Sequence, residues 1–165
     1  MRKLVLIAAI LSASAISSTA RAASMDTRMD VTATVVANCK LVVPPLSFGT
    51  YDPLITHSDQ PSDASVTMSV ICTRNTTASV SFDFGLHSSS GPDRGMNGPG
   101  SDVLHYQIYR DAARSQVWSQ GAEALRLLTK GVTTPDVLTV FGRIPPRQEV
   151  APGPYTDVLT ATVDF

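Results

Sequence analysis

Charged residues are scarce in this sequence: they make up 16% of its 165 residues, against roughly 25% in a typical soluble domain. Lysine is nearly absent, with Lys3, Lys40 and Lys130 as its three occurrences. The formal net charge of −1 excludes a strongly basic nucleic-acid-binding protein, because such a protein needs a clear excess of positive charge. Long apolar runs are also missing, and none reaches the ~20 residues that a membrane-spanning helix needs.

The N-terminus has the three parts of a secretory signal peptide, which we place at residues 1–22. Arg2 and Lys3 supply the positive start, residues 4–11 form a short apolar run, and residues 20–22 read Ala-Arg-Ala, an A-x-A cleavage site. Cleavage there predicts an exported protein of about −4 charge that begins at Ala23. A negative surface disfavours nucleic acid and anionic membranes as partners, and we expect no insertion into a membrane.

Cysteine is also rare, and Cys39 and Cys72 are the two in the chain. In an oxidising compartment an even pair favours a disulfide, which would close a loop of 34 residues. Metal binding is the weaker alternative, because two cysteines with no histidine nearby do not make a ligand set.

Valine and threonine, with 17 residues each, predict strands rather than helices. Apolar and polar residues alternate in six segments, at residues 29–39, 66–72, 78–86, 103–109, 137–144 and 155–165. Both cysteines fall on apolar faces, so they could meet inside a two-sheet core. The Gly/Pro-rich residues 87–101 predict a loop, and AEALRLL near residue 125 favours a helical turn. About seven short strands indicate an all-β fold, an immunoglobulin-like β-sandwich.

The two ends of the mature chain carry patterned segments. If the Cys39 strand has about six residues, the segment from Ala23 to about Val31 lies outside the domain. It is long enough for one further strand, which would pair with another chain. The alternative is that it pairs at the edge of its own sheet or has no order. The last strand runs to Phe165, with one face formed by Tyr155, Leu159, Ala161, Val163 and Phe165.

No arrangement of residues predicts catalysis, a cofactor or a metal. The three histidines, His57, His87 and His105, have no spacing typical of a metal site. Asp52, Asp111 and Asp157 are not spaced as an acid–base pair and are expected to cap turns. Trp118 is expected in the core. We therefore predict a protein that is not an enzyme.

Several short motifs, in their order along the chain, resemble the spore coat protein U domain found in pilins of archaic (Csu-type) chaperone–usher fimbriae. They are Cys39, residues 46–49 and 51–53, Cys72, residues 94–96, 104–111, 117–118 and 141–145, Gln148, residues 153–157 and Phe165. The resemblance covers essentially the whole mature chain.

The resemblance implies an incomplete immunoglobulin-like sandwich, at residues 32–165, that lacks its last strand and is completed by donor-strand complementation. Residues 23–31 would be the donor strand, with Met25, Met29 and Val31 as the side chains that fill the neighbour's groove. The acceptor cleft, which would also contact a chaperone, would lie along the strand that carries Tyr155, Leu159, Ala161, Val163 and Phe165. The implied partners are a periplasmic chaperone, an outer-membrane usher and identical or related pilins.

The function implied is that of a fimbrial subunit in surface adhesion and biofilm formation, exported to the periplasm and then to the cell surface or beyond. One alternative is a secreted coat or matrix protein with a spore coat protein U domain that closes its own sheet. Another is a minor adhesive fimbrial subunit.

Overall fold

The computed structural model describes residues 21–88 and 92–165, so the predicted signal peptide lies almost wholly outside the described residues. The chain divides into two units, Met1–Thr34 and Val35–Phe165. In the first unit, residues 21–34 form no helix or strand, and their side chains are exposed. The second unit contains the elements β1 (Cys39–Val42), β2 (Ser62–Cys72), β3 (Thr77–Phe82), β4 (Arg94–Asn97), β5 (Val103–Tyr109), η1 (Gly121–Glu123), β6 (Leu125–Leu128), β7 (Asp136–Ile144) and β8 (Ala161–Asp164).

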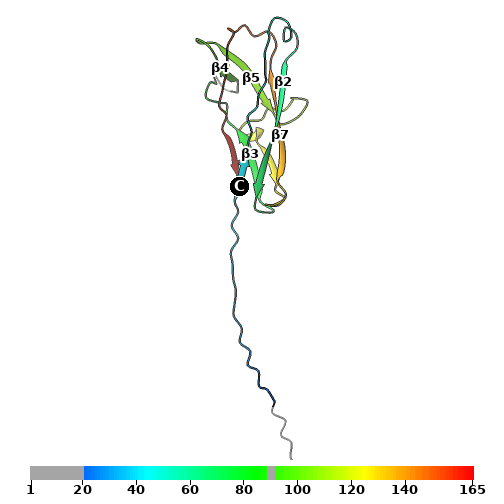
Figure 1. Ribbon diagram of the computed structural model, residues 1–165, viewed down its shortest axis with the longest axis vertical. Helices are drawn as coiled ribbons and strands as arrows, with labels where there is room; N and C mark the ends of the chain where they lie inside the picture. Colours follow the sequence, from blue (N-terminus) through cyan, green and yellow to red (C-terminus); the bar gives the residue numbers. More distant parts are fainter. Residues whose placement is uncertain (1–20, 89–91) are drawn as a thin grey trace, which may run out of the picture. The chain divides into compact units, whose positions relative to one another are not determined.

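The second unit is all-β and consists of two antiparallel sheets. The larger sheet has the order β1-β2-β7-β5-β4, and the smaller has the order β6-β3-β8. Figure 1 shows β2, β7 and β5 side by side, with the red C-terminal strand next to β3. The all-β prediction is confirmed.

The core lies between the sheets, where the alternating residues of β2, β3, β5 and β7 meet. Val70, Val80, Ile108 and Trp118 are fully buried. The indole of Trp118 donates a hydrogen bond to the Val80 carbonyl (2.9 Å) and packs edge-on against Phe82. The prediction that Trp118 belongs to the core is confirmed.

Arg94 is also fully buried, although it carries a charge. Its guanidinium donates to the carbonyl of Asp83 from Nε (3.0 Å) and Nη2 (2.6 Å), to the Trp118 carbonyl (2.9 Å) and to the Gln107 side chain. Burial lowers the pKa of this guanidinium. The hydrogen bonds tie β4 to the end of β3, so β4 forms within the Gly/Pro-rich segment that we predicted to be a loop.

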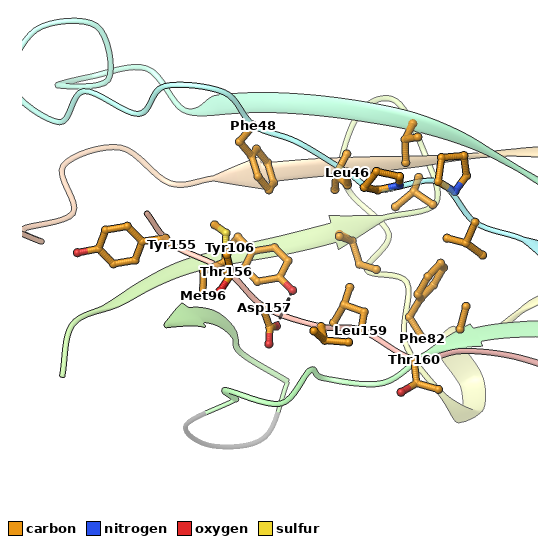
Figure 2. Close-up of a pocket in the computed structure, with 18 of the residues that line it drawn as sticks. Leu46, Phe48, Phe82, Met96, Tyr106, Tyr155, Thr156, Asp157, Leu159 and Thr160 are labelled. Carbon is orange, nitrogen blue, oxygen red and sulfur yellow. Dashed lines mark hydrogen bonds between the residues drawn. The ribbon is translucent and has the colours of Figure 1, made fainter. Parts of the chain in front are cut away.

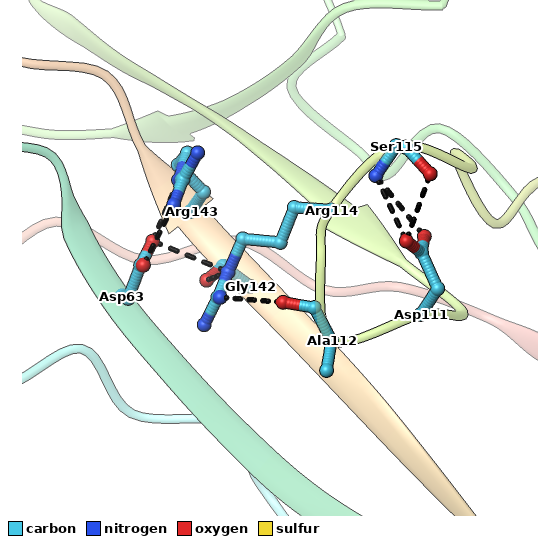
Figure 3. A network of polar contacts seen from close by, with 7 residues as sticks. All are labelled: Asp63, Asp111, Ala112, Arg114, Ser115, Gly142 and Arg143. Atoms are coloured by element: carbon cyan, nitrogen blue, oxygen red, sulfur yellow. Dashed lines mark hydrogen bonds and ion pairs between the residues drawn. The ribbon is translucent and has the colours of Figure 1, made fainter.

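A second arginine cluster fastens β2, β7 and the loop after β5 together (Figure 3). Asp63 in β2 accepts two hydrogen bonds from Arg143 in β7 (2.7 and 2.8 Å), which lower its pKa, and lies 3.2 Å from Arg114 Nε. Arg114 also donates to the Gly142 carbonyl, and the carboxylate of Asp111 accepts from the Ser115 amide. Asp111 therefore caps its loop as predicted.

The strand predicted at residues 29–39 is wrong, and the helical turn predicted in AEALRLL is found only at the start of that segment, as η1. The strand expected at residues 29–39 is absent from the described structure: β1 starts at Cys39, and residues 29–38 are exposed and unpaired in sheets. The segment AEALRLL forms η1 and then the strand β6, because pairing with β3 satisfies its backbone in a way that outweighs its helix propensity. In the part of the chain that the structure describes, no helix is long and apolar enough to span a membrane.

Candidate functional site

An apolar groove of about 820 Å³ opens between the two sheets, and we call it the sandwich groove. Leu41, Leu46 and Phe48 line one wall, and Tyr155, Leu159 and Ala161 line the other. Figure 2 shows the two walls as separate segments, with Leu46 and Phe48 on one and Tyr155–Thr160 on the other. Core residues such as Ile108 and Val140 lie between them, so the groove leads directly into the hydrophobic core.

The walls end in two strand edges that have no partner among the strands described. β1 is one of the two outer strands of the larger sheet and pairs with β2, while β8 is one of the two outer strands of the smaller sheet and pairs with β3. The two edges approach each other across the sandwich. An unpaired edge exposes a row of backbone donors and acceptors, so it can bind a further strand.

The first wall depends on Gly142 in β7. A Cβ atom there would lie 2.7 Å from the Phe48 ring and 2.8 Å from Leu46 Cδ2. The absence of a side chain therefore lets residues 46–48 lie against the sheet.

The second wall has the alternation that the sequence predicted. Tyr155, Leu159, Ala161 and Val163 are half-buried, with exposed residues between them. Tyr155, Leu159 and Ala161 line the sandwich groove; the lining does not include Val163, and Phe165 is 57% exposed. The role of these five residues as an acceptor cleft stays a prediction.

Asp157 lies on the same inward face, so it is not the turn cap that we predicted. Its side chain is 2% exposed and accepts hydrogen bonds from the Tyr106 hydroxyl (2.7 Å) and the Leu86 amide (3.1 Å), and His87 Nδ1 lies 3.0 Å away. Burial, together with the hydrogen bond to Asp157, raises the pKa of the Tyr106 hydroxyl. Asp157 thus fastens the second wall to β5 and to the segment after β3. The signal in the sequence that could have predicted this burial is the position of Asp157 on the inward face of the alternating pattern.

We expect Asp157→Asn to lower the free energy of unfolding by about 2 kcal/mol. The amide keeps the shape, but it removes the charge and turns one acceptor into a donor, which leaves a buried donor unsatisfied. Urea unfolding of the wild-type protein and the variant, both purified in the same state of assembly, would measure the change. Asp164→Asn, at an exposed position of β8, is the control and should cost less than about 0.5 kcal/mol. Equal effects of the two variants would contradict this role of Asp157.

The other predicted polar residues are dispersed. Asp52 caps a turn by accepting from the amides of Leu54 and Ile55 (3.0 and 3.1 Å), as predicted. His57 stacks on Tyr51, and its Nδ1 accepts from the Asp52 amide. Within residues 21–88 and 92–165, no group of three or more His, Cys, Asp or Glu side chains could hold a metal ion.

The structure contains the disulfide between Cys39 and Cys72. The two residues face each other in the β1–β2 ladder, so the bond joins neighbouring strands of one sheet. Cys72 is buried in the core between the two sheets and Cys39 packs against that core, as expected, and both cysteines belong to the larger sheet. The disulfide holds the start of β1, which continues into the first wall of the sandwich groove.

The predicted donor residues are strongly exposed. Met25 is 97% exposed, Met29 83% and Val31 82%. The exposed segment continues past Val31 to Asn38 and includes Val35, which is 83% exposed. The chain thus presents apolar side chains at alternate positions over a longer stretch than the predicted residues 23–31.

The sequence matches the spore coat protein U domain over residues 25–162. The chain belongs to the spore coat protein U domain family. This match starts in the exposed segment and ends in β8, so the family's pattern includes both the exposed segment and the second wall of the groove. Protein U of Myxococcus xanthus is 35% identical over 129 residues, which cover 73% of this chain and 71% of that protein.

This member of the spore coat protein U domain family is also similar to one chain of a solved structure. That structure is the CsuC–CsuE chaperone–tip adhesion subunit pre-assembly complex from the archaic chaperone–usher Csu pili of Acinetobacter baumannii. The match has a TM-score of 0.61 at 25% identity and covers 80% of this chain. This chain spans 40% of the length of the matched one.

Proposed function

We propose that this protein is an exported structural subunit of an archaic chaperone–usher fimbria and that its copies polymerise by donor-strand exchange. The N-terminal segment of one copy enters the sandwich groove of the next copy as an added strand. The fold is then an immunoglobulin-like sandwich that lacks its last strand until a neighbour supplies it. Because each copy donates to one neighbour and accepts from another, the assembly is an open filament.

The observation that carries this proposal is the apolar groove between the unpaired edges of β1 and β8. Exposed apolar surface costs about 25 cal/mol per Å², and an unpaired edge invites association with another chain. A strand added between β1 and β8 would pair with their edges and cover the groove. Completion by an added strand would therefore satisfy both edges and bury the apolar lining of the groove at once.

The exposed N-terminal segment has the length and pattern of such a strand. Tyr155 and Ala161 are separated by six residues along the second wall, about 20 Å of extended chain. Met25 and Val31 have the same separation, with Met29 between them on the same face of an extended strand. Each of these side chains would contribute about 1.5–3 kcal/mol on burial.

The partners in this proposal are a periplasmic chaperone, an outer-membrane usher and identical or related pilins. The similarity to a chain of a chaperone–subunit complex supports the chaperone in particular. The cellular roles proposed are surface adhesion and biofilm formation, after export by the signal peptide. The role is structural, with no enzymatic step.

Two related functions follow from the same family. A self-complete coat protein would close the groove with its own segment, and membership of the spore coat protein U domain family favours a coat role. A minor adhesive subunit is favoured by the similarity to a complex that contains a tip adhesion subunit. A structural subunit that forms the shaft of the fimbria should polymerise with copies of itself alone, without other pilins. This property distinguishes the shaft subunit from both alternatives.

A charge in the groove tests the proposal. Ala161→Glu places a carboxylate where the donor strand would cover it, and burial of an unpaired charge is strongly unfavourable. Each protein is expressed in a bacterial periplasm with a Csu-type chaperone and usher, and unheated samples are run on a denaturing gel. We expect the intensity of the high-mass ladder to be at least tenfold lower for this variant than for the wild-type protein.

Thr162→Glu is the matched control, since Thr162 is the neighbouring residue on the exposed face of β8. It should form ladders like those of the wild-type protein. Recovery of both variants with the chaperone would establish that they fold. Ladders of equal intensity in the two variants would rule out the sandwich groove as the acceptor, and a wild-type protein without ladders would rule out the shaft subunit.

A further inference from the structure

The chain enters the sandwich through residues 36–38, and Thr73 holds them. The Asn38 amide donates to Thr73 Oγ1 (3.1 Å), and this hydroxyl donates to the Val36 carbonyl (3.2 Å). The Thr73 amide in turn donates to the Asn38 carbonyl (2.9 Å). These three hydrogen bonds, which we call the Thr73 clamp, keep residues 36–38 in line with β1.

The clamp is anchored in the body of the sandwich. The Thr73 carbonyl accepts from the hydroxyls of Thr76 (2.6 Å) and Thr129 (3.1 Å). Thr129 is 2% exposed, and its amide donates to the Thr76 carbonyl (3.0 Å). The disulfide between Cys39 and Cys72 follows directly after the clamp. The direction in which the chain enters is therefore held by residues that directly flank β2, β3 and β6, strands of both sheets.

Only one residue near the clamp favours a chain reversal. Between Asp30 and Cys39 the sequence reads VTATVVAN, in which Asn38 is the single residue that readily adopts a positive φ. β-Branched residues such as Val35 and Val36 disfavour the tight turns of hairpins, which need positive φ. In the structure Asn38 does not have a positive φ, and its side chain accepts from the Cys39 amide (2.8 Å).

A reversal at this point is what self-closure requires. A two-residue turn at Ala37 and Asn38 would pair Val36 with Cys39 and Thr34 with Leu41, along the unpaired edge of β1. The N-terminal segment would then lie in the groove of its own domain. The Thr73 clamp opposes this arrangement because it holds Asn38 and Val36 in the extended run.

We propose that Thr73 is a positioning residue that keeps the N-terminal segment out of its own groove and so leaves the segment for a second copy of this chain. The inference rests on the proposed function, since it concerns which groove the donor strand enters. It assigns to one hydroxyl the choice between a closed monomer and a filament.

The first test is Thr73→Val, which keeps the shape of the side chain and removes the hydroxyl. Two hydrogen bonds that oppose the turn are lost, so the ratio of closed monomer to ladder should rise about tenfold. Closed monomer is measured as the compact monomer band that survives the denaturing gel without heating. Thr73→Ser keeps the hydroxyl and should retain the wild-type ratio.

The second test installs a favourable turn through Ala37→Asn with Asn38→Gly, an Asn-Gly pair. The clamp bonds of residue 38 are made by its backbone, so with Thr73 present this variant should still form ladders. With Thr73→Val added, it should become mainly closed monomer. This comparison does not depend on how well Thr73→Val alone folds.

The outcomes separate the inference from the proposed function. Wild-type ratios in both Thr73→Val variants, or a closed monomer from the Asn-Gly variant with Thr73 present, would overturn the role of Thr73 and leave donor-strand exchange intact. A wild-type protein that forms no ladder would overturn donor-strand exchange, and the role of Thr73 with it.

Discussion

Deletion of residues 23–34 is expected to abolish polymerisation and to leave a monomer that remains bound to its chaperone. These residues contain Met25, Met29 and Val31, which would contribute about 5–9 kcal/mol together if each is buried in a neighbour's groove. The deletion removes no residue of the compact unit Val35–Phe165, so the sandwich and its groove stay intact. The measurement is the loss of heat-sensitive ladders on a denaturing gel and of filaments in electron micrographs.

A full-length variant refines this prediction. Replacing Met25, Met29 and Val31 by serine keeps the length of the segment and removes its apolar face. The matched control replaces Asp26, Asp30 and Thr32, which alternate with them, by serine. We expect no ladders from the first variant and normal ladders from the second.

Three results would contradict the proposed role of residues 23–34 as the donor strand or that of its apolar side chains. If the chain without residues 23–34 still forms ladders, then another segment completes the sandwich. If both serine variants fail equally, the segment acts through its polar face as much as its apolar one, and if both form normal ladders it acts through its backbone. Either result would make the assignment of the three apolar residues wrong.

Removal of the disulfide by replacing Cys39 and Cys72 with serine should produce the largest loss of stability. A crosslink that closes a loop of 34 residues is worth about 3–4 kcal/mol in the chain-entropy model. That loss corresponds to a decrease in Tm of about 10–20 °C for a domain of this size. β1 is especially vulnerable, because it has four residues and pairs with β2 on one side alone.

The loss should also reach the groove, since β1 continues into the wall formed by Leu46 and Phe48. We therefore expect assembled polymer of the double serine variant to dissociate at a lower temperature than wild-type polymer. Reductant should lower the dissociation temperature of the wild-type polymer and leave that of the variant unchanged. Equal dissociation temperatures for the two polymers would show that β1 is held by its hydrogen bonds and packing alone.

Some parts of the structure could be predicted from local pattern. The alternation of Tyr155, Leu159 and Ala161 with exposed residues follows from the two-residue period of an extended chain. The same period places Val70 and Val80 in the core. These predictions succeed because a strand that packs one face on a core must separate its apolar and polar residues.

Other parts depended on contacts between distant residues. β4 forms in a segment rich in glycine and proline because it pairs with β5, and the buried Arg94 also ties it to the Asp83 and Trp118 carbonyls. Leu125–Leu128 is a strand because β3 offers it a hydrogen-bonding edge. Asp157 is buried because Tyr106 and Leu86 provide donors at the same place.

The sequence by itself determined an all-β domain with two cysteines suited to a disulfide, and it determined an apolar pattern near each end of the mature chain. These properties are local, since they depend on the order of side chains along an extended backbone. Tertiary structure alone decided that the cysteines lie in one sheet, that the edges of β1 and β8 face a common groove, and that residues 29–38 join neither sheet. The physical reason is that strand pairing and register are set by hydrogen bonds between residues far apart in sequence, and a single strand's pattern contains no information about which edge it will meet.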